Sequence, residues 1–171
     1  YAVTGVQTCA LPICTTARFN QPGVAIALDV PDDLPLVNID SARVEVVLHN
    51  LLSNALVYGA SEVRISVEMH ADALLISVAD NGPGIASDEL PHIFERFYRA
   101  RHGHQRHSGG TGIGLAICKA FIEAHGGVIR AESDEKGTTI SLSLPIVPPV
   151  EDAGSSPFPL TENVLTERRR V

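Results

Sequence analysis

The chain has 171 residues, of which 44% are hydrophobic, and a formal net charge of -7. This length and composition indicate one globular domain with a real core. The acidic balance argues against a protein that binds nucleic acid or a membrane surface through excess positive charge, so neither partner is expected for this chain.

The spacing of the cysteines and the hydropathy of the chain indicate where in the cell it is located. Cys9, Cys14 and Cys118 form no CxxC pair, which argues against a disulfide scaffold or a zinc ribbon. No apolar run approaches the ~20 residues needed to cross a bilayer. We expect a cytoplasmic location, either for a free protein or for the cytoplasmic part of a membrane-anchored parent.

Both ends of the chain differ from its middle. Residues 1–17 show neither helical nor strand periodicity and are predicted to be a non-native or disordered leader. Residues 148–171 contain four prolines and a terminal ERRR, which is typical of a disordered tail. The folded domain is therefore predicted to span residues 18–147.

The first half of this domain is predicted to contain strands around one long helix. FNQPGVAIALDV, residues 19–30, indicates a turn followed by a strand. Asp40 is a suitable N-cap for a helix up to Gly59, in which apolar residues recur at helical spacing. Residues 63–69 and 74–80 then alternate as two strands of an antiparallel hairpin.

The second half is predicted to add two helices and a strand pair. Ser87 is expected to cap a short helix through residues 88–97, although Pro91 disturbs its path. A well-buried helix is expected over residues 114–125, with Ile117, Ala120, Phe121 and Ala124 on one apolar face and Leu115, Cys118 and Ile122 on much of the rest. Residues 126–133 and 138–144 end the domain as strands. The predicted class is α+β, with helices on one face of a mixed or antiparallel sheet.

The stretch SGGTGIGLAI, residues 108–117, places four glycines directly before this last helix. Free amide groups at a helix start, together with the positive end of the helix dipole, form an anion site. A flexible loop is the alternative explanation. The stretch fits neither GxxxxGK[ST] nor GxGxxG, so a phosphate site here would have another design.

Two polar features occur in the first half. Asn50 and Asn54 are four residues apart and share one face of the long helix, beside its apolar stripe. They form either a solvated polar edge or an amide ligand for a Mg²⁺ ion that also binds phosphate oxygens. Asp80 ends a strand and precedes NGPGI, where it either makes an ordinary turn or accepts the exocyclic amine of adenine.

Residues 95–109 are locally basic, with four arginines against Glu95 alone. The segment is either a solvated loop or a mobile lid that places arginines over a triphosphate. His102, His104 and His107 form a weak candidate for a metal site, because the loop offers no rigid face and no acidic partner.

Taken in order, these motifs resemble those of one family. HNLLSNALVYG is similar to the N box, DNGPGI to the first glycine box, FERFYR to the F box and GGTGIGLAI to the second glycine box of sensor histidine kinases. The resemblance covers residues 18–146. It implies the catalytic ATP-binding domain of these kinases, within the gyrase, heat-shock chaperone and MutL-like ATPase superfamily, and a Bergerat-type two-layer α/β sandwich with a mobile ATP lid.

The resemblance also implies roles for individual residues. Asn54 would bind Mg²⁺, Asp80 would read adenine, Tyr58 would form a wall beside the base, and Arg99 would meet the γ-phosphate. The backbone around the loop glycines would hold the phosphate chain. The full set of residues implied to bind the nucleotide is Asn50, Asn54, Tyr58, Asp80, Gly82, Gly84, Ile85, Phe97, Arg99, Gly110, Thr111, Gly112, Gly114 and Leu115.

One position of the N box indicates the type of reaction. Hydrolytic members of the superfamily carry a water-activating glutamate where this chain has Asn50, and an amide cannot accept the proton. Asn50 and Arg99 are therefore the catalytic candidates for phosphoryl transfer to a histidine on an upstream dimerisation domain, and a response regulator is the further partner. No such hairpin is recognised in this sequence, so the chain alone is expected to be inactive.

Two other functions stay open at this point. Val57 stands where the family often has lysine, which favours a non-catalytic nucleotide-binding module used for docking. An anti-sigma-type serine kinase shares the asparagine and glycine boxes, but the FERFYR segment argues against it.

Overall fold

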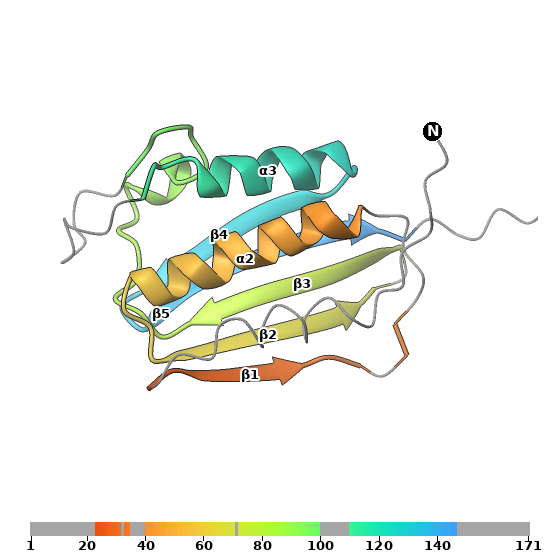
Figure 1. Ribbon diagram of the computed structural model, residues 1–171, viewed down its shortest axis with the longest axis horizontal. Coiled ribbons are helices and arrows are strands. Elements are labelled where there is room, and N and C mark those ends of the chain that lie inside the picture. Colours follow the sequence, from red (N-terminus) through yellow and green to blue (C-terminus); the bar gives the residue numbers. More distant parts are fainter. Residues whose placement is uncertain (1–22, 32, 35–39, 71, 100–109, 147–171) are drawn as a thin grey trace, which may run out of the picture.

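The computed structural model describes residues 23–31, 33–34, 40–70, 72–99 and 110–146. Within these residues the chain forms two layers, with two helices lying across one face of a five-stranded sheet (Figure 1). The predicted α+β sandwich with a mixed sheet is confirmed. The predicted leader (1–17), the predicted tail (148–171), the three loop histidines and most of the basic segment lie outside the described residues.

Helix α2, Ser41–Val57, forms where the apolar spacing predicts it. The Asp40 side chain caps it by accepting a hydrogen bond from the Arg43 amide at 3.3 Å. Its buried residues recur at intervals of three and four, so one stripe faces the sheet. They are Val44, Val47, Leu48, Leu51, Leu52 and Ala55.

The strand order is β1-β2-β3-β5-β4, with bounds β1 Ala25–Asp29, β2 Glu62–Met69, β3 Ala73–Asp80, β4 Val128–Asp134 and β5 Gly137–Pro145. Among the strands in the described residues, only β1 pairs in parallel, with β2, and the other neighbours are antiparallel. The β3–β5 pairing joins strands far apart in the sequence. Its register sets Asp80 opposite Thr138 and Val78 opposite Ile140, which brings two separate hairpins to one edge of the site.

Alternation along the strands separates two faces of the sheet. The face beneath the helices is apolar, with Ile65, Leu142 and Leu144 fully buried. On the other face of the sheet, β3 and β5 carry serines, and the Ser77 and Ser141 hydroxyl oxygens are 3.0 Å apart. The core therefore lies entirely between the sheet and the helices.

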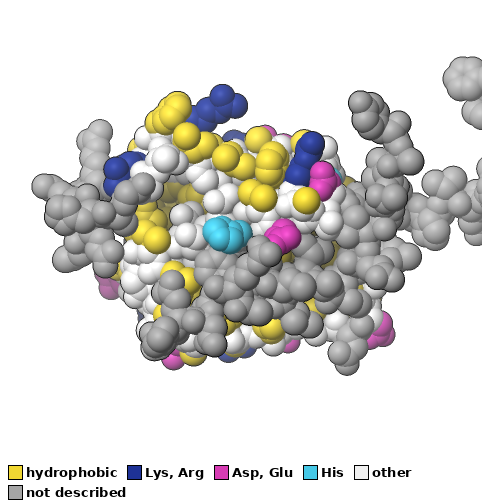
Figure 2. All heavy atoms as spheres, in the orientation of Figure 1, with side chains coloured by type: hydrophobic (Ala, Val, Ile, Leu, Met, Phe, Trp, Pro, Cys, Tyr) yellow, Lys and Arg dark blue, Asp and Glu magenta, His cyan; other side chains and the backbone are white. Residues whose placement is uncertain are grey.

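Helix α3, Gly114–Ala124, forms where it is expected and lies beside α2. Cys118 and Ile122 are buried as expected, and Leu115, Ile117 and Phe121 are half-buried, whereas Ala120 and Ala124 are exposed. The expected burial of Ala120 and Ala124 was wrong, because α3 covers the edge of the sheet and packs sideways against α2. Figure 2 shows the result: hydrophobic side chains gather along the top of this view, over α3 and the segment before it.

The helix predicted for residues 88–97 is also wrong. The structure has only a 3₁₀ turn, Leu90–His92, flanked by further turns, and no side chain caps it. Pro91 explains the difference, because proline has no amide hydrogen and its ring obstructs the preceding turn of an α-helix. The segment therefore crosses the site as an irregular loop.

No helix in the described ranges is long and apolar enough to cross a membrane.

We expect the α2 stripe to dominate stability, and two adjacent valines test this. Val47 is 0% exposed and Val46 is 43% exposed. Val47→Ala should lower the free energy of unfolding by about 2 kcal/mol through lost burial and a residual cavity. Val46→Ala should change it by less than about 0.5 kcal/mol. Equilibrium urea denaturation measures both, and equal effects would contradict the assigned helix face.

Candidate functional site

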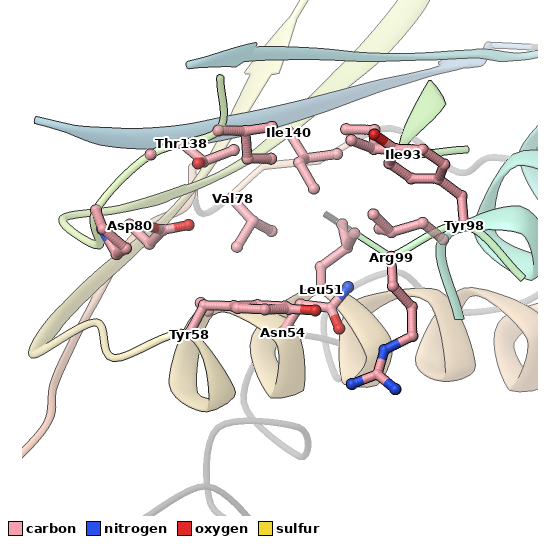
Figure 3. A pocket seen from close by; sticks show the side chains of 15 residues that line it. Leu51, Asn54, Tyr58, Val78, Asp80, Ile93, Tyr98, Arg99, Thr138 and Ile140 are labelled. Atoms are coloured by element: carbon pink, nitrogen blue, oxygen red, sulfur yellow. The ribbon is translucent and has the colours of Figure 1, made fainter. Parts of the chain in front are cut away.

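A cavity of about 110 Å³ opens between α2, strands β3 and β5, and the loop that follows β3 (Figure 3). Its walls are mostly apolar, and a few polar groups point into it from different elements. This is the usual make-up of a small-molecule site. The residues that line it are Leu51, Asn54, Ala55, Tyr58, Val78, Asp80, Pro83, Gly84, Ile85, Ile93, Tyr98, Arg99, Leu115, Thr138 and Ile140.

Asp80 provides the carboxylate of this cavity from the end of β3. The Gly82 amide donates a hydrogen bond to Asp80 Oδ1 at 2.8 Å, so the turn holds the side chain in place. Burial raises the pKa of Asp80 above its ordinary value, while hydrogen bonds from the Gly82 and Thr138 amides act in the opposite direction. The site thus holds a half-buried carboxylate that a donor group on a ligand can satisfy.

The turn after Asp80 packs directly against the β4–β5 hairpin, and glycines permit this contact. Gly84 has φ +74°, and a Cβ there would lie 1.9 Å from the Asp134 carbonyl oxygen. Gly137 has φ +146°, and a Cβ there would lie 1.8 Å from the Asp80 carbonyl oxygen. No larger residue fits either position without moving the backbone.

Asn81, next to Asp80, fixes the opposite side of the turn. Its Oδ1 accepts hydrogen bonds from the Ser61 and Glu62 amides, both at 2.9 Å. These bonds tie the end of β3 to the chain that leaves α2. The helix and the carboxylate are therefore held at a fixed separation across the cavity.

Asn54 of α2 and Tyr58, the residue that caps the C-terminus of this helix, line the cavity about one turn apart. In Figure 3 Tyr58 lies across from Asp80, with Asn54 farther along the same helix. Tyr58 is 47% exposed, so its ring borders the mouth. Asn54 offers a neutral amide oxygen of the kind that Mg²⁺ accepts alongside other oxygen ligands.

Arg99 lines the cavity at the end away from Asp80 (Figure 3). Just before it, Phe97 has φ +66°, which is unusual for a bulky residue, and its side chain is 73% exposed. The Phe97 amide donates to the Gly112 carbonyl oxygen at 2.8 Å. The glycine loop is therefore attached by its backbone to the segment that carries Arg99.

Asn50 is near the start of α3 rather than in the cavity wall. A Cβ on Gly114 would lie 3.3 Å from Asn50 Oδ1, so the two helices approach closely here. Asn50 also hydrogen-bonds the Cys118 thiol, whose Sγ donates to the Val47 carbonyl oxygen at 3.8 Å. Burial raises the pKa of the Cys118 thiol to about 12.

The structure thus brings together about half of the residues implied by the resemblance. Those among the cavity-lining residues are Asn54, Tyr58, Asp80, Gly84, Ile85, Arg99 and Leu115. Seven others are described but are not part of its wall: Asn50, Gly82, Phe97, Gly110, Thr111, Gly112 and Gly114. Gly82 and Gly112 act on the wall indirectly, through their hydrogen bonds to Asp80 and Phe97.

Several lining residues were missed by the sequence analysis. Val78, Thr138 and Ile140 complete the sheet side of the cavity. Period-2 alternation gives a signal for Val78, which lies two residues before Asp80 on the same face. Thr138 and Ile140 depend on the β3–β5 register, which neither strand's own pattern specifies.

Comparison with known proteins identifies the family. The family model described as histidine kinase-, DNA gyrase B-, and HSP90-like ATPase matches residues 39–148. Signal transduction histidine-protein kinase AfsQ2 of Streptomyces coelicolor is 44% identical over 127 residues, covering 73% of this chain and 24% of the relative. Sensor histidine kinase WalK of Bacillus subtilis is 43% identical over 129 residues, covering 72% of this chain and 21% of the relative.

Solved structures give the same result for the fold. A mycobacterial sensor histidine kinase, MprB, superimposes with a TM-score of 0.75 at 26% identity, covering 85% of this chain and 99% of that one. Full-length ShkA in complex with AMPPNP gives a TM-score of 0.72 at 26% identity, covering 85% of this chain and 31% of that one.

The chain spans about a quarter or less of the length of these two kinases from Streptomyces and Bacillus. Their names favour the sensor-kinase interpretation over an anti-sigma-type serine kinase. The match to the family model, the related sequences and the shared fold agree with the motifs that meet in the cavity. The chain therefore belongs to the histidine kinase-, DNA gyrase B-, and HSP90-like ATPase family, on its sensor histidine kinase side.

Proposed function

We propose that this domain binds Mg·ATP in the cavity and transfers the γ-phosphoryl group to a histidine on an upstream dimerisation domain of a two-component sensor kinase. The observation that carries the proposal is the convergence of Asn54, Asp80 and Arg99 on one cavity, from a helix, a strand end and a loop. ShkA, a structural neighbour, is described in complex with the ATP analogue AMPPNP, which supports a nucleotide as the ligand.

The end of the cavity near Asp80 suits the adenine base. Val78 and Ile140 provide apolar walls from paired strands, and Tyr58 borders the opposite side. A carboxylate held by the turn accepts a hydrogen bond from an exocyclic amine, which gives base selectivity. The triphosphate then extends toward Arg99.

Asn54 is the residue that would hold Mg²⁺. Across the described part of the chain, no group of three or more acidic, histidine or cysteine side chains could hold a metal by itself. A single amide oxygen fits an ion that takes most of its ligands from phosphate oxygens and water. When bound, Mg²⁺ would neutralise charge on the phosphates during transfer.

Arg99 and the glycine loop would act on the phosphate chain. Arginine forms paired, charge-assisted hydrogen bonds with phosphate oxygens, which orients the γ-phosphate. The loop backbone around Gly110 and Gly112 leads into Gly114, the first residue of α3, where free amides favour an anion.

The reaction is transfer rather than hydrolysis. Asn50 occupies the position where hydrolytic relatives carry glutamate, and its amide cannot take a proton from water. In the transfer, the bond between the γ-phosphorus and the β–γ bridging oxygen breaks as a bond to an imidazole nitrogen forms, and ADP leaves. Positioning and charge neutralisation supply the catalysis.

A phosphoacceptor domain and a response regulator complete the proposed pathway, and the domain would work in the cytoplasm. We expect this chain alone to show no autophosphorylation, because the histidine must be supplied from another segment. The direct test adds labelled ATP and a dimerisation hairpin from a matched full-length kinase. Label on the histidine supports the proposal.

Val57 favours a second candidate function, a nucleotide-binding module without catalytic activity. This residue is 37% exposed and stands where the family often has lysine, so one cation is missing near the site. A non-catalytic nucleotide-binding module used for docking would bind ATP but leave the added histidine unlabelled. That result would replace the kinase proposal.

Removal of the metal ligand gives one prediction. Asn54→Ala should lower affinity for a non-hydrolysable ATP analogue by about ten-fold in magnesium, and should remove the difference between titrations with and without magnesium. Ser53→Ala, the neighbouring position outside the cavity wall, is the control and should behave as the parent. Isothermal calorimetry measures both, and parental affinity in Asn54→Ala would remove it from the site.

Replacement of the carboxylate gives a second prediction with two readouts. Asp80→Asn should reduce the preference for ATP over GTP by about ten-fold, because an amide no longer offers only acceptors to the base. Competition binding measures the preference.

The same variant should be more stable than the parent at neutral pH. Burial raises the folded-state pKa of Asp80 above its ordinary value of 3.8, so the ionised form destabilises the fold. This cost is absent below pH 3.8 and grows as the pH rises through the folded-state pKa. The urea midpoint of Asp80→Asn should therefore exceed that of the parent at pH 7 by more than at pH 4. A constant difference would contradict the burial effect.

The glycine loop gives a third prediction with a matched control. Gly112 has φ +68°, and a Cβ there would lie 2.8 Å from the Tyr98 carbonyl oxygen, whereas a Cβ on Gly110 meets nothing within 4 Å. Gly112→Ala should weaken binding of the ATP analogue by about five-fold, because it moves the loop off the Phe97 segment. Gly110→Ala should retain parental affinity in the same titration. Equal losses would show that the loop contact does not matter for binding.

A further inference from the structure

Ser133, near the end of β4, joins three parts of the site through one hydroxyl group. The Ile85 amide donates to Ser133 Oγ at 2.8 Å. Ser133 Oγ donates to the Gly137 carbonyl oxygen at 2.9 Å and is also 2.9 Å from Thr138 Oγ1. Of these partners, Ile85 and Thr138 line the cavity, whereas Ser133 is behind them.

The direction of the Ser133–Thr138 bond follows from counting protons. A serine hydroxyl has one hydrogen and two lone pairs. The Gly137 carbonyl oxygen can only accept, so the Ser133 hydrogen is used there. The hydrogen between Ser133 and Thr138 must therefore come from Thr138, and the Ile85 amide fills the remaining lone pair of Ser133.

Because its hydrogen is used in the bond to Ser133, the Thr138 hydroxyl oxygen presents only lone pairs to the cavity. Its register partner is Asp80, and both side chains are at the same end of the cavity (Figure 3). The Gly82 amide, a donor close to Asp80, is already bonded to its carboxylate. Together Thr138 and Asp80 present hydrogen-bond acceptors to a ligand.

We infer that Ser133 determines base specificity by fixing the Thr138 hydroxyl as an acceptor, so that the Asp80 end of the cavity selects a 6-amino purine and rejects a 6-oxo purine. The inference rests on the proposed ATP-binding function and adds a positioning residue that does not touch the base. A 6-amino group offers donors to both acceptors. A 6-oxo group is itself an acceptor, so it forms no hydrogen bond with Asp80 or Thr138 and leaves these acceptors unsatisfied.

Loss of the Ser133 hydroxyl releases the Thr138 hydrogen. The threonine hydroxyl then turns and points its hydrogen into the cavity, where it meets a 6-oxo group. The variant should thus bind inosine nucleotides better relative to adenosine nucleotides. A merely structural role for Ser133 would weaken both nucleotides equally and leave their ratio unchanged.

The test compares Mg·ATP with Mg·ITP, which differ at the 6-position, by calorimetric titration of each purified variant. Ser133→Ala should lower the ratio of the ITP Kd to the ATP Kd by about five-fold. Ser133→Thr keeps a hydroxyl and should keep the parental ratio. Ser141→Ala is the matched control, because Ser141 also pairs with a serine hydroxyl but its register position is on the sheet face away from the cavity.

A second variant covers the case in which Ser133→Ala does not fold, as judged by circular dichroism. Ser133→Cys keeps the shape of the side chain with a somewhat larger atom that is a poor acceptor, and should lower the ratio in the same direction. An unchanged ratio in whichever of these variants folds overturns the inference. So does a parent that binds ATP and ITP equally. A parent that binds neither nucleotide would instead overturn the proposed function.

Discussion

The contact between the turn after β3 and the β4–β5 hairpin determines the geometry of the site. It brings two backbones closer than any side chain permits, and Gly84 and Gly137 make that approach possible. The contact holds Asp80 beside Thr138 at the end of paired strands. On the other side, Asn81 ties the same turn to the exit of α2. The cavity is thus fixed by backbone packing on one side and by side-chain hydrogen bonds on the other.

Much of this arrangement follows from local sequence patterns. The long apolar stripe predicts α2 and its cap, and alternation predicts the strands, because each signal is contained within one element. The ordered motifs then predict the cavity residues Asn54, Asp80 and Arg99. The sequence does not predict Thr138 or Ser133, since their roles depend on the register between distant strands and on a hydroxyl network across two hairpins.

Two errors have different physical origins. The segment after the first glycine turn has helical composition, yet Pro91 limits it to a 3₁₀ turn. Helix α3 has apolar residues on more than one side, so periodicity alone does not select which side is buried. For α3, tertiary context chooses among locally acceptable faces. The Phe97–Gly112 backbone hydrogen bond is likewise a tertiary contact, and it couples the arginine segment to the glycine loop although neither motif shows it alone.

The Cys118 thiol is sealed between α2 and α3, with 0% of its side chain exposed and its pKa raised to about 12. A thiol in that state is not a nucleophile, so an alkylating reagent reacts with it only when the two helices part and the proton can leave. Its rate of labelling therefore counts the openings of the helix pair. Cys118 is therefore an intrinsic probe of the separation of α2 and α3. A nucleotide that contacts both helices would slow this labelling.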